Sequence, residues 1–389
     1  MRSRQLIVGS LFLSYLSFGY ADEQAMPFPL TPPAVDAASW VLMDATTGQI
    51  LTEGNADQRR NPASLTKLMT GYVVDRAIDQ HRITRDDVVT VGNDAWGAGN
   101  PVFKGSSLMF LKPGEKVTVR DLSRGVIIDS GNDACVALAD YVAGSQASFV
   151  TMMNEYVEKL GLKNTHFETV HGLDAPGQFT TARDLATLSQ AIIKGEPDFY
   201  QMYSEKSLTW NGITQQNRNG LLWDKTLHVD GLKTGHTESA GFNIIASSTE
   251  GQRRLIAVIM GGKSPKGREE QARKLLTWGQ NTFDTVQLFH AGKAIGHETV
   301  WYGNTHQIDV GTNQDIYLAL PRESVKNIKA KYVIDHKDLE APLKANEQIG
   351  TIQVMDNDKQ LASYPLLALQ PVERGGMVSR LMDYLKLKL

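Results

Sequence analysis

The sequence has little cysteine, little imbalance of charge and no clustered metal ligands. Its single cysteine, Cys135, excludes an intrachain disulfide, and the apolar residues 136–139 after it indicate a buried side chain rather than a catalytic thiol. The formal net charge is −3 without a block of Lys and Arg, which argues against a nucleic-acid partner. No group of His, Cys, Asp and Glu has metal-ligand spacing, so we expect no metal and no other cofactor.

The chain also lacks an apolar run long enough to span a membrane comfortably. Near the N-terminus, Arg2 and Arg4 precede an apolar run from Leu6 to Phe18, and small residues at positions 19 and 21 follow. This layout predicts a secretory signal peptide over residues 1–21, cleaved after Ala21. An uncleaved anchor is the alternative, although the run of about a dozen residues is short for a span.

The rest of the chain predicts an α+β domain followed by a small all-β domain. A hairpin near residues 40–52, a series of helices, three strands and a last helix over residues 268–283 indicate an antiparallel sheet with helices, over residues 22–285. Short strand-like runs separated by turn residues then indicate an all-β domain over residues 286–372. We interpret this second domain as a spacer or docking module.

The final segment, residues 373–389, predicts an amphipathic helix. At about 100° per residue, one arc of the helix is apolar and the opposite arc is polar. The apolar arc holds Met377, Val378, Leu381, Met382, Tyr384, Leu385 and Leu389, and the polar arc holds Ser379, Arg380, Asp383 and Lys386. Such a helix suits the surface of an anionic membrane, and the alternative is a helix packed on its own domain.

The first motif with chemical potential is Ser64-Leu65-Thr66-Lys67. Asn61 is a good N-cap and Pro62 suits the first helical position, so we expect Ser64 in the first turn of a helix. Positions i and i+3 share a helix face, which allows the Lys67 amine to reach the Ser64 hydroxyl. Lysine acts as a base only if burial and a nearby cation lower its pKa towards neutrality.

The second motif is Ser130-Gly131-Asn132, between two apolar stretches. Polar residues in such a loop are often only turn formers and helix caps. The functional interpretation is that Ser130 relays a proton to a leaving amine, while the Asn132 amide holds the lysine and the substrate backbone.

The third motif is Lys233-Thr234-Gly235-His236, at the end of a predicted strand. Strand backbone can pair with an extended peptide, and Lys233 and Thr234 can attract a terminal carboxylate. We expect Gly235 to remove bulk where the substrate lies close, and Lys233 to be the cation that lowers the pKa of Lys67.

The order of the three motifs resembles the penicillin-binding protein and serine β-lactamase superfamily. Residues 60–70 (RNPASLTKLMT), 100–110 (NPVFKGSSLMF) and 233–236 (KTGH) look like the D-alanyl-D-alanine carboxypeptidases of Gram-negative bacteria. These are low-molecular-mass, class C, type-5 penicillin-binding proteins. The resemblance extends over essentially the whole chain and implies a β-lactamase/transpeptidase-like domain, a β-rich second domain and an amphipathic tail.

The resemblance also implies an activity and a location. The substrate would be a peptidoglycan stem pentapeptide ending in D-Ala-D-Ala, Ser64 would attack the penultimate D-alanine carbonyl, and β-lactams would acylate the same serine as inhibitors. The family location is the periplasmic face of the inner membrane.

Further site residues follow from the resemblance alone. The backbone N–H groups of Ser64 and His236 would form the oxyanion hole, and Arg268 would help Lys233 and Thr234 to hold the terminal carboxylate. His171 would lie in a loop near the floor of the site and not act as a base.

Three alternatives remain beside the carboxypeptidase. A D,D-endopeptidase uses the same motifs. A weak β-lactamase is the second alternative, although residues 168–172 lack the Glu-x-x-Leu-Asn pattern of class A enzymes. A non-enzymatic envelope scaffold is the third, and the intact set of motifs speaks against it.

Overall fold

The computed structural model describes residues 30–335 and 338–388, so the predicted signal peptide lies outside the described part of the chain. The chain divides into two compact units, which we describe separately. Among the described residues, the first comprises residues 30–297 and 309–327, and the second comprises residues 298–308, 328–335 and 338–388. The predicted domain boundary at residues 285 and 286 falls inside strand β10 (Phe283–Phe289), which belongs to the first unit.

An antiparallel sheet of five strands organises the first unit. Its order is β2-β1-β9-β8-β7, so the early hairpin adjoins a late strand and β7 forms one edge. Apolar strand segments separated by short turns account for the hairpins at the two ends of the sheet. The strands are β1 (Ser39–Asp44), β2 (Ile50–Gly54), β7 (His228–Thr237), β8 (Gly241–Glu250) and β9 (Arg253–Gly262).

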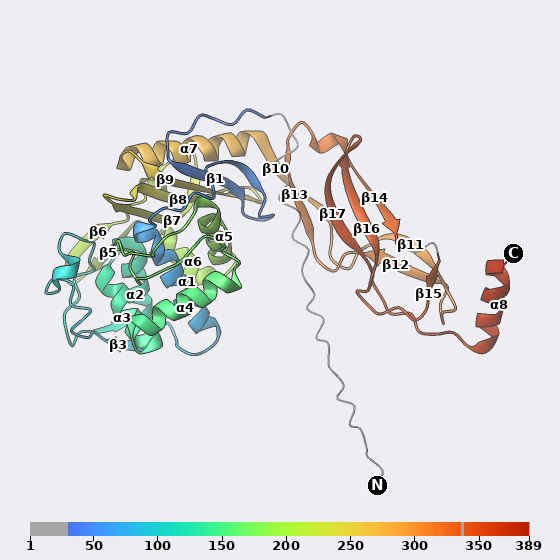
Figure 1. Cartoon of the computed structure of the whole chain (residues 1–389), viewed down its shortest axis with the longest axis horizontal. Helices are drawn as coiled ribbons and strands as arrows, with labels where there is room; N and C mark the ends of the chain where they lie inside the picture. The colour runs from blue at the N-terminus through green and yellow to red at the C-terminus, as the bar shows by residue number, and fades with distance from the viewer. Residues whose placement is uncertain (1–29, 336–337, 389) are drawn as a thin grey trace, which may run out of the picture. The chain divides into compact units, whose positions relative to one another are not determined.

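Helices cover both faces of this sheet (Figure 1). Helix α7 (Pro265–Thr282) packs on one face, and the remaining helices of the unit lie on the other, where α5 contacts β1 and β9. The helices of that second face are α1 (Thr66–Asp79), α2 (Val119–Arg124), α3 (Asn132–Ala143), α4 (Gln146–Lys159), α5 (Ala182–Ile193) and α6 (Pro197–Gln201). The predicted α+β architecture is confirmed.

Short strands complete the first unit in three two-stranded sheets. These are β3 (Val88–Thr90) with β4 (Lys116–Thr118), β5 (Ser207–Trp210) with β6 (Ile213–Gln216), and β10 with β13 (Ile316–Pro321). Between the large sheet and the helices lies a continuous apolar core. Cys135 on α3 is fully buried in this core, and burial raises the pKa of its thiol to about 11, so the thiolate is not available.

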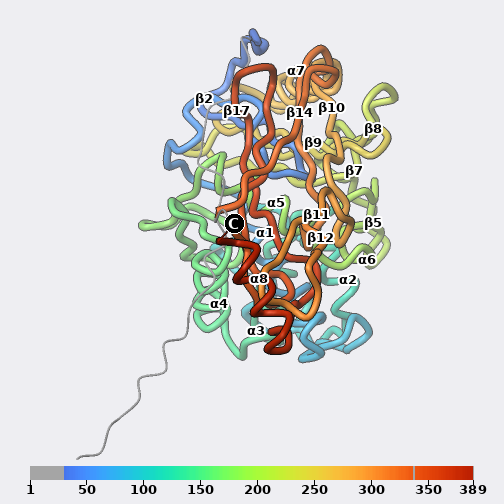
Figure 2. Tube along the Cα trace, turned by 90° about the vertical axis from the view of Figure 1, so that its right-hand side faces the viewer, coloured from blue at the N-terminus to red at the C-terminus, as the bar shows by residue number. Residues whose placement is uncertain are grey.

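The second unit is built on a sheet of six strands, in the order β14-β16-β17-β12-β11-β15. Strand β16 lies between β14 and β17 and runs antiparallel to both; β14 and β17 are labelled in Figure 2. The strands are β11 (Ala294–Trp301), β12 (Gln307–Gly311), β14 (Ile328–Ile334), β15 (Leu339–Glu340), β16 (Gln348–Asp356) and β17 (Lys359–Ala368). The all-β character predicted for this part of the chain is present.

The chain continues into helix α8 (Met377–Lys388), as the apolar periodicity predicts. The Asp383 side chain is 1% exposed and accepts a hydrogen bond from the Tyr302 backbone N–H (2.8 Å). The polar arc of α8 therefore faces its own unit at this residue. Within the described residues, no helix is long and apolar enough to cross a membrane.

Candidate active site

Ser64 lies in a short 3-10 turn (Ala63–Leu65) directly before α1. The predicted N-cap is wrong, because Pro62 occupies that position and the Asn61 side chain donates instead to the Ser239 hydroxyl (2.6 Å). The physical cause is the backbone at Ala63, whose φ of +49° interrupts a continuous helix ahead of α1. Left-handed, non-glycine residues of this kind are typical of functional sites.

The Lys67 amine reaches the nucleophile as predicted. Its Nζ lies 3.1 Å from Ser64 Oγ, and it also donates to Asn132 Oδ1 (2.7 Å) and to the backbone carbonyl of His171 (2.6 Å). These three acceptors come from three separate segments of the chain. Lys67 is 1% exposed, so its amine has no alternative partner in bulk water. The hydroxyl and the amine are therefore held together by the fold.

Burial, with a smaller contribution from the Arg218 guanidinium, lowers the pKa of Lys67 from 10.5 to about 8. Lys233, the cation expected from the sequence, is coupled to Lys67, so its effect on the pKa of Lys67 stays a prediction. Lys233 is itself buried, and burial together with Lys67, Arg218 and Arg268 holds its pKa well below the ordinary value. The two amines therefore disfavour each other's charged form inside the same dry environment.

Ser130 follows a π-helical turn (Gly125–Asp129) and has a φ of +59°. Its hydroxyl is buried and has no hydrogen-bond partner among the described residues. A π-turn followed by a left-handed residue is typical of a functional site. This hydroxyl is free to engage a bound substrate. Among the described residues no hydrogen bond joins Ser130 to Lys67, so the role of Ser130 as a proton relay stays a prediction.

Strand β7 carries the third motif past the nucleophile. An added Cβ atom on Gly235 would lie 3.0 Å from the Ser64 backbone nitrogen and 3.1 Å from that of Leu65. Position 235 requires glycine, as predicted, but the physical reason is a different one. The strand approaches the enzyme's own nucleophile turn, and not only the substrate.

The expected carboxylate-binding residues gather at the same strand. Lys233 and Thr234 are buried, and Arg268 on α7 donates to the carbonyls of Gly235 (3.3 Å) and Asn243 (3.2 Å). Burial lowers the pKa of Arg268 to about 10, which leaves it cationic at neutral pH. These residues form a basic end of the strand that suits an anionic group.

His236, the last residue of the motif, stacks on Phe242 with ring centroids 4.0 Å apart. These two residues are opposite each other in the β7–β8 pairing, so the imidazole is held on the sheet. Because β7 is an edge strand, its other side can accept an extended peptide.

Three further contacts in the site were not predicted from the sequence. The His171 carbonyl binds Lys67, Ser106 Oγ accepts from the Asn132 side chain (2.8 Å), and Arg218 donates to Ser107 Oγ. Burial lowers the pKa of His171 to about 3, so its ring stays neutral. A backbone carbonyl has no sequence signature. Ser106 and Ser107, however, lie within the 100–110 stretch that carries the family resemblance.

The arrangement can perform acyl transfer without a metal. It combines a hydroxyl with a buried amine, an unpartnered second hydroxyl, an amide and a cationic strand end. Within the described residues, no group of three His, Cys, Asp or Glu side chains could hold a metal ion.

Comparison with known proteins agrees with this geometry. The family model described as D-alanyl-D-alanine carboxypeptidase (peptidase S11) matches residues 26–264, and the penicillin-binding protein 5 C-terminal domain matches residues 283–374. The crystal structure of penicillin binding protein 6B from Escherichia coli is 64% identical, with a TM-score of 0.77, and covers 89% of this chain and 99% of its own.

Within the family, the resemblance of the sequence predicts the DacD type, which is penicillin-binding protein 6b. The D-alanyl-D-alanine carboxypeptidase DacD of Salmonella typhimurium is 66% identical over 100% of this chain and 99% of its own. DacA of Escherichia coli is 50% identical over 99% of this chain and 96% of its own, in agreement with the DacD type. The chain therefore belongs to the peptidase S11 family of D-alanyl-D-alanine carboxypeptidases.

Proposed function

We propose that this protein removes the terminal D-alanine from peptidoglycan stem pentapeptides through an acyl-Ser64 intermediate. Ser64 Oγ attacks the penultimate D-alanine carbonyl carbon, and its proton passes to Lys67 Nζ. The observation that supports this role most directly is the 3.1 Å contact between a buried amine of lowered pKa and that hydroxyl. The backbone N–H groups of Ser64 and His236 bind the oxyanion, each contributing about 3–4 kcal/mol.

The leaving group departs at the basic end of β7. Lys233, Thr234 and Arg268 hold its carboxylate, and the Ser130 hydroxyl delivers a proton to its nitrogen as the C–N bond breaks. Lys67 returns to Ser130 the proton that it took from Ser64. Asn132 supports the substrate backbone and orients Lys67. Water then attacks the ester, the C–O bond breaks and Ser64 regains its proton.

β-Lactams would follow the same first step and stop at the acyl-enzyme. Glu168 is the acidic residue of the loop at residues 168–172, and its carboxylate lies 3.1 Å from exposed His166 Nε2. Because the Glu168 carboxylate pairs with His166 at the surface, it is poorly placed to activate the water that would hydrolyse the acyl-enzyme. We therefore propose slow hydrolysis of the bound antibiotic rather than β-lactamase turnover.

Two measurements test this function. Intact mass after mixing with penicillin, followed by peptide mapping, is expected to give one adduct on Ser64 and none in a Ser64→Ala variant. Release of free D-alanine from monomeric pentapeptide is expected to exceed cleavage of crosslinked dimers. Faster cleavage of the dimers would instead make the protein an endopeptidase.

We also propose that α8 holds the protein on the periplasmic face of the inner membrane after export by residues 1–21. Six apolar residues of α8 are between 45% and 87% exposed, while buried Asp383 sits on the opposite arc. The exposed six are Met377, Val378, Leu381, Met382, Tyr384 and Leu385. Lys386 and Lys388 in the last turn add attraction to anionic lipids.

Sedimentation with vesicles tests the membrane proposal. The mature protein is expected to bind vesicles that contain anionic lipid, and truncation before Met377 is expected to release it while activity on soluble substrate persists. A Leu381→Glu variant should weaken binding. Val333→Glu is the matched control, because it adds the same charge at an exposed apolar position of β14. Unchanged binding of the truncated protein would refute the anchor.

A further inference from the structure

Asn243 lies on β8, directly opposite Gly235 in the β7–β8 pairing. Opposite residues of an antiparallel pair project onto the same face of the sheet, so its side chain leaves the sheet on the face that approaches Ser64. The side chain is 0% exposed, although it is strongly polar. A buried amide needs partners for its donor and its acceptor, and these partners indicate what it does. No step of the mechanism above uses this residue.

The Asn243 amide contacts the turn that carries the nucleophile. Its Oδ1 accepts from the Gly261 backbone N–H (2.8 Å), and its Nδ2 donates to the Pro62 carbonyl (3.4 Å). The same Pro62 carbonyl accepts from the Leu65 N–H (3.2 Å), and this bond closes the 3-10 turn around Ser64. Asn243 therefore binds the oxygen that closes the nucleophile turn.

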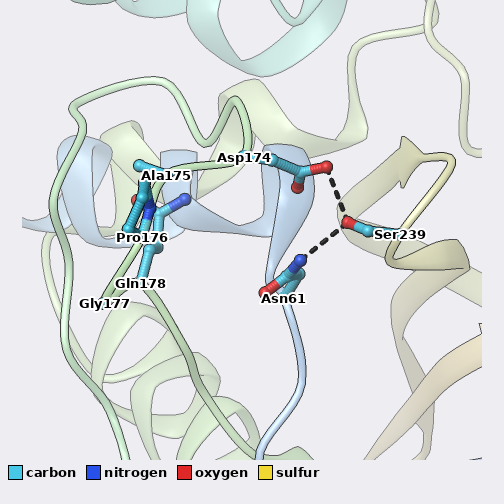
Figure 3. A pocket seen from close by; sticks show the side chains of 7 residues that line it. All are labelled: Asn61, Asp174, Ala175, Pro176, Gly177, Gln178 and Ser239. Carbon is cyan, nitrogen blue, oxygen red and sulfur yellow. Dashed lines mark hydrogen bonds between the residues drawn. The ribbon is translucent and has the colours of Figure 1, made fainter.

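The backbone of this turn is strained at Ala63, whose φ is +49°. A non-glycine residue keeps such a conformation only where the surrounding contacts impose it. The orientation of the Pro62–Ala63 peptide relative to Ser64 depends on this dihedral angle, and Asn243 restrains that peptide at its carbonyl oxygen. On the other side of Pro62, the Asn61 side chain donates to Ser239 Oγ (2.6 Å; Figure 3). The turn is thus held to the sheet at two points.

The backbone of Asn243 joins the second half of the site. Its carbonyl accepts from Arg268 Nη1 (3.2 Å), and the same guanidinium nitrogen donates to the Gly235 carbonyl (3.3 Å). One buried residue therefore contacts both the nucleophile turn and the cation expected to hold the substrate carboxylate. These two parts of the site must keep a fixed separation if a bound peptide is to present its carbonyl to Ser64.

We propose that Asn243 is a positioning residue for the acylation step. Its amide holds the Pro62–Ala63 peptide so that the Ser64 N–H points into the oxyanion hole while the Ser64 hydroxyl stays at Lys67. Asn243 does not touch the substrate and takes no part in proton transfer. Its effect falls on the transition state, because the oxyanion forms only there. The inference rests on the proposed function and adds a supporting residue to it.

The Asn243→Asp variant tests the donated bond, because it keeps an acceptor for the Gly261 N–H and removes the donor to Pro62. In the mature protein, kcat and kcat/KM for D-alanine release from Nα,Nε-diacetyl-L-lysyl-D-alanyl-D-alanine are expected to fall by the same factor, about 10- to 100-fold. Penicillin acylation should slow similarly, and the midpoint of its pH profile, set by Lys67 at about 8, should not move. Asn243→Ala removes the donor without adding a charge and is expected to show the same loss.

Asn219 offers a matched control. It is also 0% exposed, donates through Nδ2 to the Gly231 carbonyl (3.0 Å) on β7 and accepts from the Leu221 N–H (3.2 Å). Asn219→Asp therefore removes an equivalent buried donor from a contact that does not involve the nucleophile turn. Thermal unfolding is expected to show a similar loss of stability in both aspartate variants, whereas the rates of Asn219→Asp should stay within about twofold of the wild type.

The possible outcomes separate this inference from the function on which it rests. Rates within about twofold of the wild type in both Asn243 variants would overturn the positioning role. Equal losses of rate in Asn243→Asp and Asn219→Asp would also overturn it, because general loosening of the fold would then explain both. A displaced pH midpoint would place the effect on Lys67 instead of the turn. A wild-type protein that neither releases D-alanine nor is acylated at Ser64 would refute the proposed function itself.

Discussion

Gly235 and Ser64 are in backbone contact, so a Cβ atom on the glycine would lie 3.0 Å from the serine nitrogen. The atoms around that position are backbone atoms of Ser64, Leu65 and Pro62, which cannot rotate away as a side chain would. The edge strand and the nucleophile turn thus fix each other's position. The oxyanion hole proposed for Ser64 and His236 depends on this contact.

The Gly235→Ala variant is therefore expected to lose activity while remaining folded. A displacement near 1 Å between nucleophile and strand costs about 10- to 100-fold in the rate of penicillin acylation, measured by stopped flow. The matched control is Gly376→Ala, because an added Cβ at Gly376 meets no atom within 4 Å. If penicillin acylates Gly235→Ala as fast as the wild type, the contact between Gly235 and Ser64 is not needed for acylation.

The acylation rate is expected to depend on pH through Lys67. Its amine is the base in the uncharged form, and its pKa is about 8 because the side chain is buried. The rate should rise about tenfold per pH unit below 8 and level off above it, so that pH 6 gives roughly one hundredth of the plateau. A flat profile between pH 6 and 9 would exclude this amine as the base.

A Lys67→Arg variant tests the same point with the charge kept. Arginine remains protonated throughout this range, so it cannot accept the Ser64 proton. Acylation is expected to fall about 10²- to 10⁴-fold, and the remaining rate should lose the rise towards pH 8. Thermal unfolding monitored beside the kinetics distinguishes a lost base from a lost fold.

Gly172 supports the loop whose carbonyl at His171 binds Lys67. Its φ is +91°, and an added Cβ atom would lie 1.9 Å from the Ala63 carbonyl oxygen. Gly172→Ala should lower the free energy of unfolding by about 3 kcal/mol or more, from clash and strain combined. Gly144→Ala is the control, because Gly144 also has a positive φ but open space around its Cβ position. Equal melting temperatures for the two variants would contradict the close approach.

Asp129 carries a buried carboxylate beside Ser130, and neither of its oxygens has a hydrogen-bond partner among the described residues. Burial raises its pKa from 3.8 to about 7. Because the folded pKa lies above the unfolded one, ionisation opposes folding, and stability is lost as the pH rises from about 4 to 7. Asp129→Asn should therefore gain in melting temperature relative to the wild type between pH 5 and pH 8, by about 3 °C or more. A difference that does not change with pH would show that this carboxyl is not destabilised by ionisation.

Local patterns in the chain were sufficient for much of this structure. The spacing of Ser64 and Lys67 predicts their contact, because residues three apart share a face in any helical turn. The periodicity of residues 377–388 likewise predicts α8, and the alternation of apolar runs with turns predicts the sheet. The local pattern failed at Asn61. Its side chain does not cap the helix, because it donates a hydrogen bond to Ser239, which lies far along the chain.

The sequence by itself determined which groups are available: a serine with a lysine three residues on, the two later motifs, and an amphipathic end. The tertiary structure alone decided how those groups behave. Dehydration of Lys67, the lowered pKa of Lys233 and the approach of Gly235 to Ser64 all arise where segments distant in the chain exclude water from one another. Desolvation and close packing are properties of that assembled environment, so no local pattern encodes them.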